Sequence, residues 1–186
     1  DSPTCYDLIT GSVLCLGKVT NTQNRAIAHV RLRVLLLDAA MGVIGDSPAG
    51  VEQAMIPPGQ SAPYSTLFTP GVEGYVQAAV ELLSASSAAG ENLIALSILN
   101  ENVVHDGSRY RVTATLFNAA GAAVGPARVV LMLLDAEGHV AGYRVMTLAT
   151  GLEADARQPI EIEAVAQAHT GELTHQLYAE ARLAGD

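Results

Sequence analysis

One pattern of residues occurs twice in this chain, and this internal repeat limits the possible folds more than any other feature. Two blocks recur after 97 residues and a third recurs after 96, in the same order. The matching blocks are residues 17–21 with 114–118, residues 31–39 with 128–136, and residues 56–64 with 152–160. A repeat of about half the 186 residues predicts a duplication, and so two small domains of similar fold.

Each half consists of short segments in which apolar and polar residues alternate. In residues 109–116, Tyr110, Val112, Ala114 and Leu116 alternate with arginine and threonine. This period of two is typical of a β-strand with one buried face. Turn residues separate such segments about every ten residues, and continuous helical periodicity is missing. The pattern predicts an all-β fold, either a sandwich or a barrel, with small polar residues at 84–90 as the linker between the domains.

The turns support this prediction. Asp106-Gly107 is a dipeptide typical of a two-residue hairpin loop in which both residues have positive φ. Asp38 and Asp135 each follow an apolar run at the first position of a turn, where aspartate caps its own backbone. Met41 is an additional residue in the first of these turns, so we expect a longer loop there.

Part of the repeated pattern resembles the FxLYD-type domain. The residues that carry the resemblance are Gly17, Val19 and Asn21, the run at 30–39, and the Pro-Pro-Gly-Gln segment before Tyr64. The match covers residues 13–83 and, more weakly, residues 110–183. This family is a small immunoglobulin-like β-sandwich of bacterial and archaeal secreted or membrane-anchored proteins. The resemblance implies two tandem immunoglobulin-like antiparallel β-sandwich domains, residues 1–86 and 91–186, and no catalytic residues.

Cys5 and Cys15 are the two cysteines of the chain. A three-residue loop ending at Gly11 would pair Leu8 with Ser12, and counting outward from that pair places Cys5 opposite Cys15. Opposed residues of antiparallel strands have Cα atoms ~4.5–5.5 Å apart, which is within disulfide range. We therefore predict a Cys5–Cys15 disulfide, with two buried free thiols as the alternative. A disulfide favours a location outside the cytoplasm.

Motifs of catalysis and metal binding are missing from the sequence. There is no Gly-x-Ser-x-Gly motif, and the glycines at 121 and 125 precede a predicted strand rather than a helix. The histidines do not have the spacing of a known metal motif. We therefore expect no enzymatic activity, no cofactor and no metal site. The histidines are His29, His105, His139, His169 and His175.

Charge and hydropathy exclude further classes of partner. The formal net charge is -9, from 19 acidic and 10 basic residues, whereas nucleic-acid binding needs clustered lysine and arginine. No apolar run approaches the ~20 residues of a transmembrane helix, so we expect no membrane insertion within this chain. The chain begins with Asp1 rather than Met, and an upstream anchor or a cleaved signal peptide is compatible with that start.

Two equivalent strands carry apolar residues on both faces. In the first, Leu32, Val34 and Leu36 are expected to face the core, which places Leu35 and Leu37 on the outer face. In the repeat, the outer face carries Met132 and Leu134. Either a loop or the neighbouring domain covers these four residues, or they form an interface with a partner protein.

The sequence therefore suggests a function class without a specific partner. Our hypothesis is a non-enzymatic extracytoplasmic structural or accessory module, which makes protein–protein contacts in a cell-surface or envelope assembly. The expected partner is another protein or a second copy of the chain. An edge strand at 5–9 or 93–103 could pair with the next copy and allow self-assembly. The alternative is a ligand-binding module for a glycan, a peptide or a metal ion.

Overall fold

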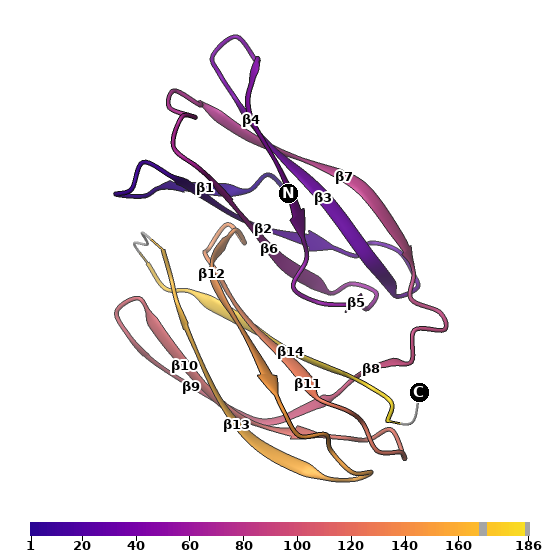
Figure 1. Ribbon diagram of the computed structural model, residues 1–186. Coiled ribbons are helices and arrows are strands. Elements are labelled where there is room, and N and C mark those ends of the chain that lie inside the picture. Colours follow the sequence, from indigo (N-terminus) through magenta and orange to yellow (C-terminus); the bar gives the residue numbers. More distant parts are fainter. Residues whose placement is uncertain (168–170, 185–186) are drawn as a thin grey trace. The chain divides into compact units, whose positions relative to one another are not determined.

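The computed structural model describes residues 1–167 and 171–184 (Figure 1). Within these residues all regular structure is β-strand, and the strands pair antiparallel. The chain divides into two compact units, Asp1–Ala88 with Glu137–Val140, and Ala89–Ala136 with Ala141–Asp186. The predicted fold, two tandem immunoglobulin-like antiparallel β-sandwich domains, is confirmed. Among the described residues, no helix is long and apolar enough to span a membrane.

The first sandwich has two sheets. One sheet has the order β1-β2-β6 and contains β1 (Thr4–Asp7), β2 (Val13–Thr20) and β6 (Ser61–Phe68). The other is built on β3 (Ile27–Leu37), which pairs with β4 (Val43–Gly50), β5 (Met55–Ile56) and β7 (Gln77–Ser87). The core between the sheets includes Cys15 and Tyr64 from the first sheet and Leu32, Val34 and Leu36 from the second. These three β3 residues are the ones predicted to face inward.

The second sandwich repeats this plan and differs from the first in two short strands. One sheet has the order β13-β10-β9 and contains β13 (Arg157–Val165), β10 (Arg109–Phe117) and β9 (Ser97–Asp106). The other has the order β12-β11-β14-β8 and contains β12 (Val140–Leu148), β11 (Ala127–Leu134), β14 (Thr174–Arg182) and β8 (Leu93–Ala95). Tyr110, Val112, Ala114 and Leu116 of β10 all belong to the core, as their alternation predicts. The short strand β8 has no counterpart among the strands of the first sandwich, whereas the pairing made by β5 is reduced in the second sandwich to the isolated bridge between Val124 and Leu152.

A buried asparagine just after one strand donates hydrogen bonds to a residue four positions on and to a residue more than 30 positions away in both sandwiches. The Asn21 side-chain amide donates to the carbonyls of Arg25 and Ile56, each at 2.8 Å. The Asn118 amide donates to the carbonyls of Ala122 and Leu152, at 2.8 and 3.1 Å. Their acceptors correspond in the repeat, and the two side chains are at most 1% exposed. The repeated hydrogen bonds explain why the duplicated sequence keeps asparagine at these positions, since a buried carbonyl needs a donor.

Three local predictions differ from the structure. Residues 84–87 were expected in the linker, but they extend β7 because they pair with β3. Asp106 pairs with Arg109, so the hairpin loop is Gly107-Ser108, and only Gly107 has positive φ (57°). Positive φ at the first loop residue alone is typical of a type II′ turn. The segment at 93–103, expected as one edge strand, is divided between β8 and β9, which belong to different sheets.

Candidate functional site

The β1–β2 hairpin carries the disulfide. Cys5 lies opposite Cys15 in the register of the two strands, their Cα atoms are 4.0 Å apart, and their sulfur atoms are bonded. The loop is the expected one, because the Leu8 amide donates to the Ser12 carbonyl at 2.8 Å and the Gly11 amide to the Leu8 carbonyl at 2.9 Å. The predicted disulfide is confirmed. Neither cysteine is therefore a free thiol that could act as a nucleophile.

The four outer-face residues predicted as an interface are buried. Leu35 and Leu37 are 8% and 9% exposed, and Met132 and Leu134 are 2% and 7% exposed. None of the four belongs to either core cluster, which agrees with their assignment to the face opposite the core. Their low exposure places them outside the accessible apolar surface. Their contact with a partner protein stays a prediction.

The accessible apolar side chains are instead concentrated on strands at the edges of the sheets. The strands β4, β6, β7, β9 and β13 each have one sheet neighbour in the strand order and carry valine or leucine residues that are 47–63% exposed. An edge strand also presents backbone N–H and C=O groups without a ladder partner, and natural edges usually carry charges or proline for protection. These edges are the candidate contact sites. The residues are Val43, Leu67, Leu82, Leu83, Val104 and Val165.

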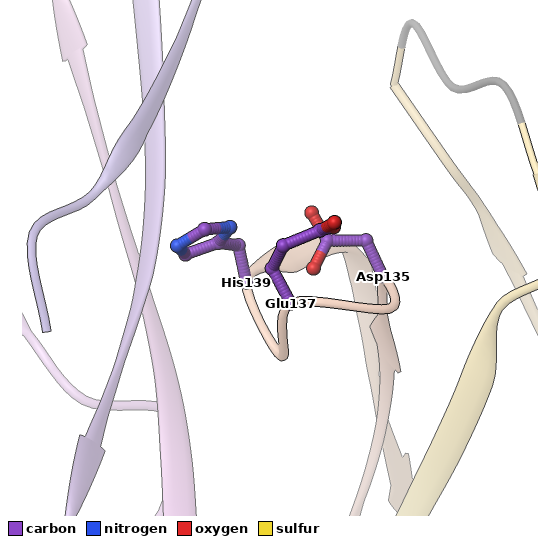
Figure 2. A group of neighbouring side chains, drawn as sticks. All are labelled: Asp135, Glu137 and His139. Atoms are coloured by element: carbon purple, nitrogen blue, oxygen red, sulfur yellow. The ribbon is translucent and has the colours of Figure 1, made fainter.

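A group of potential metal ligands lies on the turn between β11 and β12. Figure 2 shows the side chains of Asp135, Glu137 and His139, which extend from this one turn. Their potential ligand atoms lie within 4.8 Å of one another, and theirs is the one group of three of this kind in the described part of the chain. Two carboxylates and an imidazole are ligands that suit Zn²⁺ and related divalent ions. Glu137 and His139 are exposed, and Asp135 is half-buried.

Sequence reasoning did not bring these three residues together. Asp135 was assigned to a turn cap and His139 to a solvated loop. The sequence feature that could have identified them is their spacing at alternate positions, Asp-x-Glu-x-His. The turn includes Gly138, which has a φ of 82°. In the equivalent turn of the first sandwich, Asp38 is a cap, because its Oδ1 accepts the amides of Ala40 at 2.9 Å and Gly42 at 2.8 Å. A capping role for Asp135 stays a prediction.

Two other histidines, His105 and His175, have separate surroundings. The Nε2 atom of His175 contacts the Glu101 carboxylate. The His105 ring stacks on Tyr110 with a centroid distance of 5.0 Å. His169, considered with His175 in the sequence as the closest pair, lies outside the described residues. These contacts give no common site for His105 and His175.

An open groove of about 630 Å³ lies between β12 and β13. Glu161 and Glu163 line it, and two carboxylates in one groove are a pattern to test for acid–base chemistry. Glu163 accepts hydrogen bonds from Arg109 at 2.8 Å and from Arg111 at 3.3 Å. Glu161 forms an ion pair with Arg111 at 3.5 Å. Both carboxylates are thus part of a cross-strand ion-pair ladder on the face of β10 and β13 opposite the core.

Comparisons with known proteins give distant likenesses only. No family model matches the sequence, and no curated protein matches it. Among solved structures, a β-glucuronidase from glycoside hydrolase family 2 aligns over 87% of this chain and 21% of its own, at 8% identity and TM-score 0.33. Bacteroides uniformis β-glucuronidase aligns over 92% and 25%, at 9% identity and TM-score 0.30. Red sea bream transglutaminase aligns over 97% and 29%, at 10% identity and TM-score 0.29. This chain therefore spans less than a third of each of these structures, and likenesses with TM-scores this low say nothing about its activity.

Proposed function

We propose that this chain is a non-enzymatic extracytoplasmic module, of the FxLYD type, that makes protein–protein contacts in a cell-surface or envelope assembly. Its contact sites are the edges of its sheets. The net charge of -9 disfavours nucleic acid as the partner, so the partner is another protein or a second copy of the chain.

One observation carries this proposal, the exposed apolar residues on edge strands. Leu82 and Leu83 on β7 are 63% and 55% exposed, and Val104 on β9 is 62% exposed. An apolar side chain in water gains by burial, and an edge strand can extend its hydrogen-bond ladder into another chain. The combination of both features on the same strands favours contacts by strand addition.

The location and the absence of catalysis rest on other residues. The Cys5–Cys15 disulfide supports an oxidising compartment, since disulfides are rare in the cytosol. The same bond removes both thiols from nucleophilic chemistry. The glutamates of the β12–β13 groove are engaged by arginines, which supports a structural role for them.

The test is the native mass of the protein purified from its source, measured by light scattering with mass spectrometry of the co-purifying chains. We expect either a larger homogeneous particle or a stable complex of defined composition. A stable monomer without companions would contradict the proposal. Crosslinking with mass spectrometry then locates the contact, and crosslinks on the edge strands are expected.

A further inference from the structure

An open pocket of about 420 Å³ lies between the β1–β2 hairpin and the loop that precedes β7, at residues 69–76. The strand registers bring these two segments to the same end of the first sandwich. Asp7 lies opposite Val13, Val13 lies opposite Phe68, and the loop follows Phe68 directly. All of the lining residues belong to this one sandwich, so its own strands and loops define the pocket.

The second sandwich spans the equivalent gap with a side chain of its own. Tyr110 corresponds to Val13 at the repeat offset of 97. It is 4% exposed, and its hydroxyl accepts a hydrogen bond at 3.3 Å from the amide of Leu173, in the loop before β14. His105, which corresponds to Asp7, stacks on the Tyr110 ring. Because valine is much smaller than tyrosine, the first sandwich keeps a pocket where its duplicate has a planar ring.

The lining of the pocket combines aliphatic side chains with two carboxylates. Leu8 and Val72 line it and are half-buried, whereas Asp7 and Glu73 line it and are exposed. The Tyr75 hydroxyl donates to Oδ1 of Asp7 at 3.4 Å, which joins the loop to the hairpin. Residues 7–13 and 69–76 contain no arginine, lysine or histidine, so neither segment supplies a cation to the two carboxylates.

Carboxylates on the strands, by contrast, are matched by arginines of the chain itself. Arg33 pairs with Glu81 at 2.9 Å and with Asp46 at 3.5 Å. In the second sandwich, Glu163 pairs with Arg109 at 2.8 Å. Complementary charge selects the partner at a contact surface, so a pocket with two carboxylates and no cation in either wall favours a cationic group from another molecule.

We propose that this pocket binds an arginine side chain of a partner polypeptide. The aliphatic stem of the arginine packs on Leu8 and Val72, and its guanidinium group donates to Asp7 and Glu73. Arginine fits better than lysine, because its planar group resembles the flat ring of the second sandwich and offers five donors to two carboxylates. Ile9 follows Leu8 at the hairpin tip and is fully exposed, so it gives an apolar residue beside the arginine a surface to cover.

This inference rests on the proposed function in one respect, that the partner is a polypeptide. The site itself is separate from the exposed valines and leucines of the edge strands. It adds the chemistry of the partner, an exposed arginine with an aliphatic neighbour.

The first experiment titrates the isotope-labelled full chain with the peptide acetyl-Gly-Leu-Arg-Leu-Gly-amide and follows the backbone amides by NMR. We expect saturable shift changes confined to residues 7–13 and 71–76. The same peptide with citrulline in place of arginine is the control, because citrulline keeps the length and shape of the side chain and lacks its charge. Its affinity should be at least tenfold weaker.

A matched pair of double variants locates the binding site. Asp7→Asn with Glu73→Gln removes both carboxylates of the pocket and should weaken peptide binding at least tenfold. Asp46→Asn with Glu81→Gln removes two carboxylates that contact Arg33 outside the pocket, and should leave binding unchanged. All four residues are exposed, so both proteins are expected to fold, which a thermal melt verifies.

A smaller probe distinguishes a polypeptide partner from a free guanidinium compound. N-acetylarginine amide carries the same charged side chain without the neighbouring leucines, so it should bind more weakly than the peptide. Ile9→Ser should weaken binding of the peptide and leave binding of N-acetylarginine amide unchanged, because only the peptide has an apolar neighbour to place on the hairpin tip.

Three results would overturn this inference. They are the absence of saturable shift changes up to millimolar peptide, equal affinity for the arginine and citrulline peptides, or equal affinity for the peptide and N-acetylarginine amide. The last result would assign the pocket to a small guanidinium compound. None of the three contradicts the proposed function, which is tested separately by native mass and companions; a monomer without companions that still binds the arginine peptide would contradict the proposed function and leave the pocket in place.

Discussion

The two sandwiches share one plan and differ in matched pairs of residues. Where the first has the Cys5–Cys15 pair across its first hairpin, the second has Val103 opposite Val112. Cys15 and Val112 are both fully buried in their cores. The same position therefore accepts either a covalent link or two packed valines. The comparison indicates that the cross-strand pair, rather than the single residue, is the unit that can be exchanged in these sheets.

A second matched pair supports this conclusion. Gly17 lies opposite Tyr64 in the first sandwich, and Ala114 lies opposite Ile160 in the second. A Cβ atom on Gly17 would lie 2.3 Å from Cζ of Tyr64, which is fully buried. The tyrosine ring thus occupies the space that a side chain at residue 17 would need. In the second sandwich the smaller isoleucine leaves room for the alanine methyl group.

The largest effect is expected at the feature that the two sandwiches have in common. Asn21→Ala and Asn118→Ala each remove an amide that donates to two or more backbone carbonyls. The carbonyls that lose this donor are partly or fully buried, so each variant should lower the free energy of unfolding by ~4 kcal/mol. Native-state hydrogen exchange resolves the two sandwiches and should show each loss in its own domain. A much larger loss in one sandwich would show that the repeated bonds are not equivalent.

The second-largest loss of stability is expected at the first hairpin, where the two sandwiches differ in sequence. The double variant Cys5→Val, Cys15→Val installs the pair of the second sandwich and removes a link between residues 10 apart in sequence. Loop-closure entropy predicts a loss of ~3 kcal/mol in the first sandwich only. The reciprocal variant Val103→Cys, Val112→Cys is the control, and it should form a disulfide and stabilise the second sandwich. Unfolding monitored with and without reductant measures both, and equal stability of oxidised protein and valine variant would contradict the entropic account.

The glycine–tyrosine pair predicts a smaller loss with a specific rescue. Gly17→Ala forces the Tyr64 ring to move and should cost ~2 kcal/mol. Adding Tyr64→Ile recreates the pair of the second sandwich, so the double variant should be more stable than the sum of the two single changes predicts. Denaturant unfolding of the four proteins gives this coupling energy. Additive effects would show that the ring has room to relax.

The sequence predicted the features of this fold that depend on neighbouring residues. Alternation along β10 predicted its buried face, and counting outward from Gly11 predicted the Cys5–Cys15 pair, because both follow from local strand geometry. The end of β7 was missed because its small polar residues resemble a linker, and only pairing with β3 makes them a strand. The division between β8 and β9 at Leu96 was missed for the same reason, since β8 pairs with a strand more than 80 residues away.

The features of the candidate contact residues also divide into some that the sequence predicted and some that it did not. The outer-face position of Leu35, Leu37, Met132 and Leu134 followed from alternation, but their burial depends on tertiary cover that a sequence pattern does not contain. The contrast between Leu82, which is exposed, and its cross-strand neighbour Leu32, which is buried, became visible only from the register of β7 with β3. The 63% exposure of Leu82 depends on which segments pack beside β7, and local sequence does not record such tertiary neighbours.

The smallest effect concerns the Tyr64 hydroxyl, which has no counterpart at Ile160. Burial raises the pKa of Tyr64 from 10.0 to about 12, and its hydroxyl has no hydrogen-bond partner among the described residues. Between pH 10 and pH 12 the unfolded chain loses this proton while the folded chain keeps it, so stability is fully present below pH 10 and falls as the pH rises. At pH 11 the loss should be ~1 kcal/mol in the first sandwich.

Burial also raises the pKa of Tyr178 in the second sandwich, with a contribution from Glu180, so an alkaline loss alone does not identify Tyr64. Tyr64→Phe separates the two, because it keeps the ring over Gly17 and removes only the ionisable group. The variant should match or slightly exceed the parent at pH 7, since it removes a buried hydroxyl without a partner, and it should lose less stability than the parent between pH 10 and 12. Hydrogen exchange of first-sandwich amides over this range measures the difference, and an unchanged pH profile in Tyr64→Phe would assign the alkaline loss to other groups.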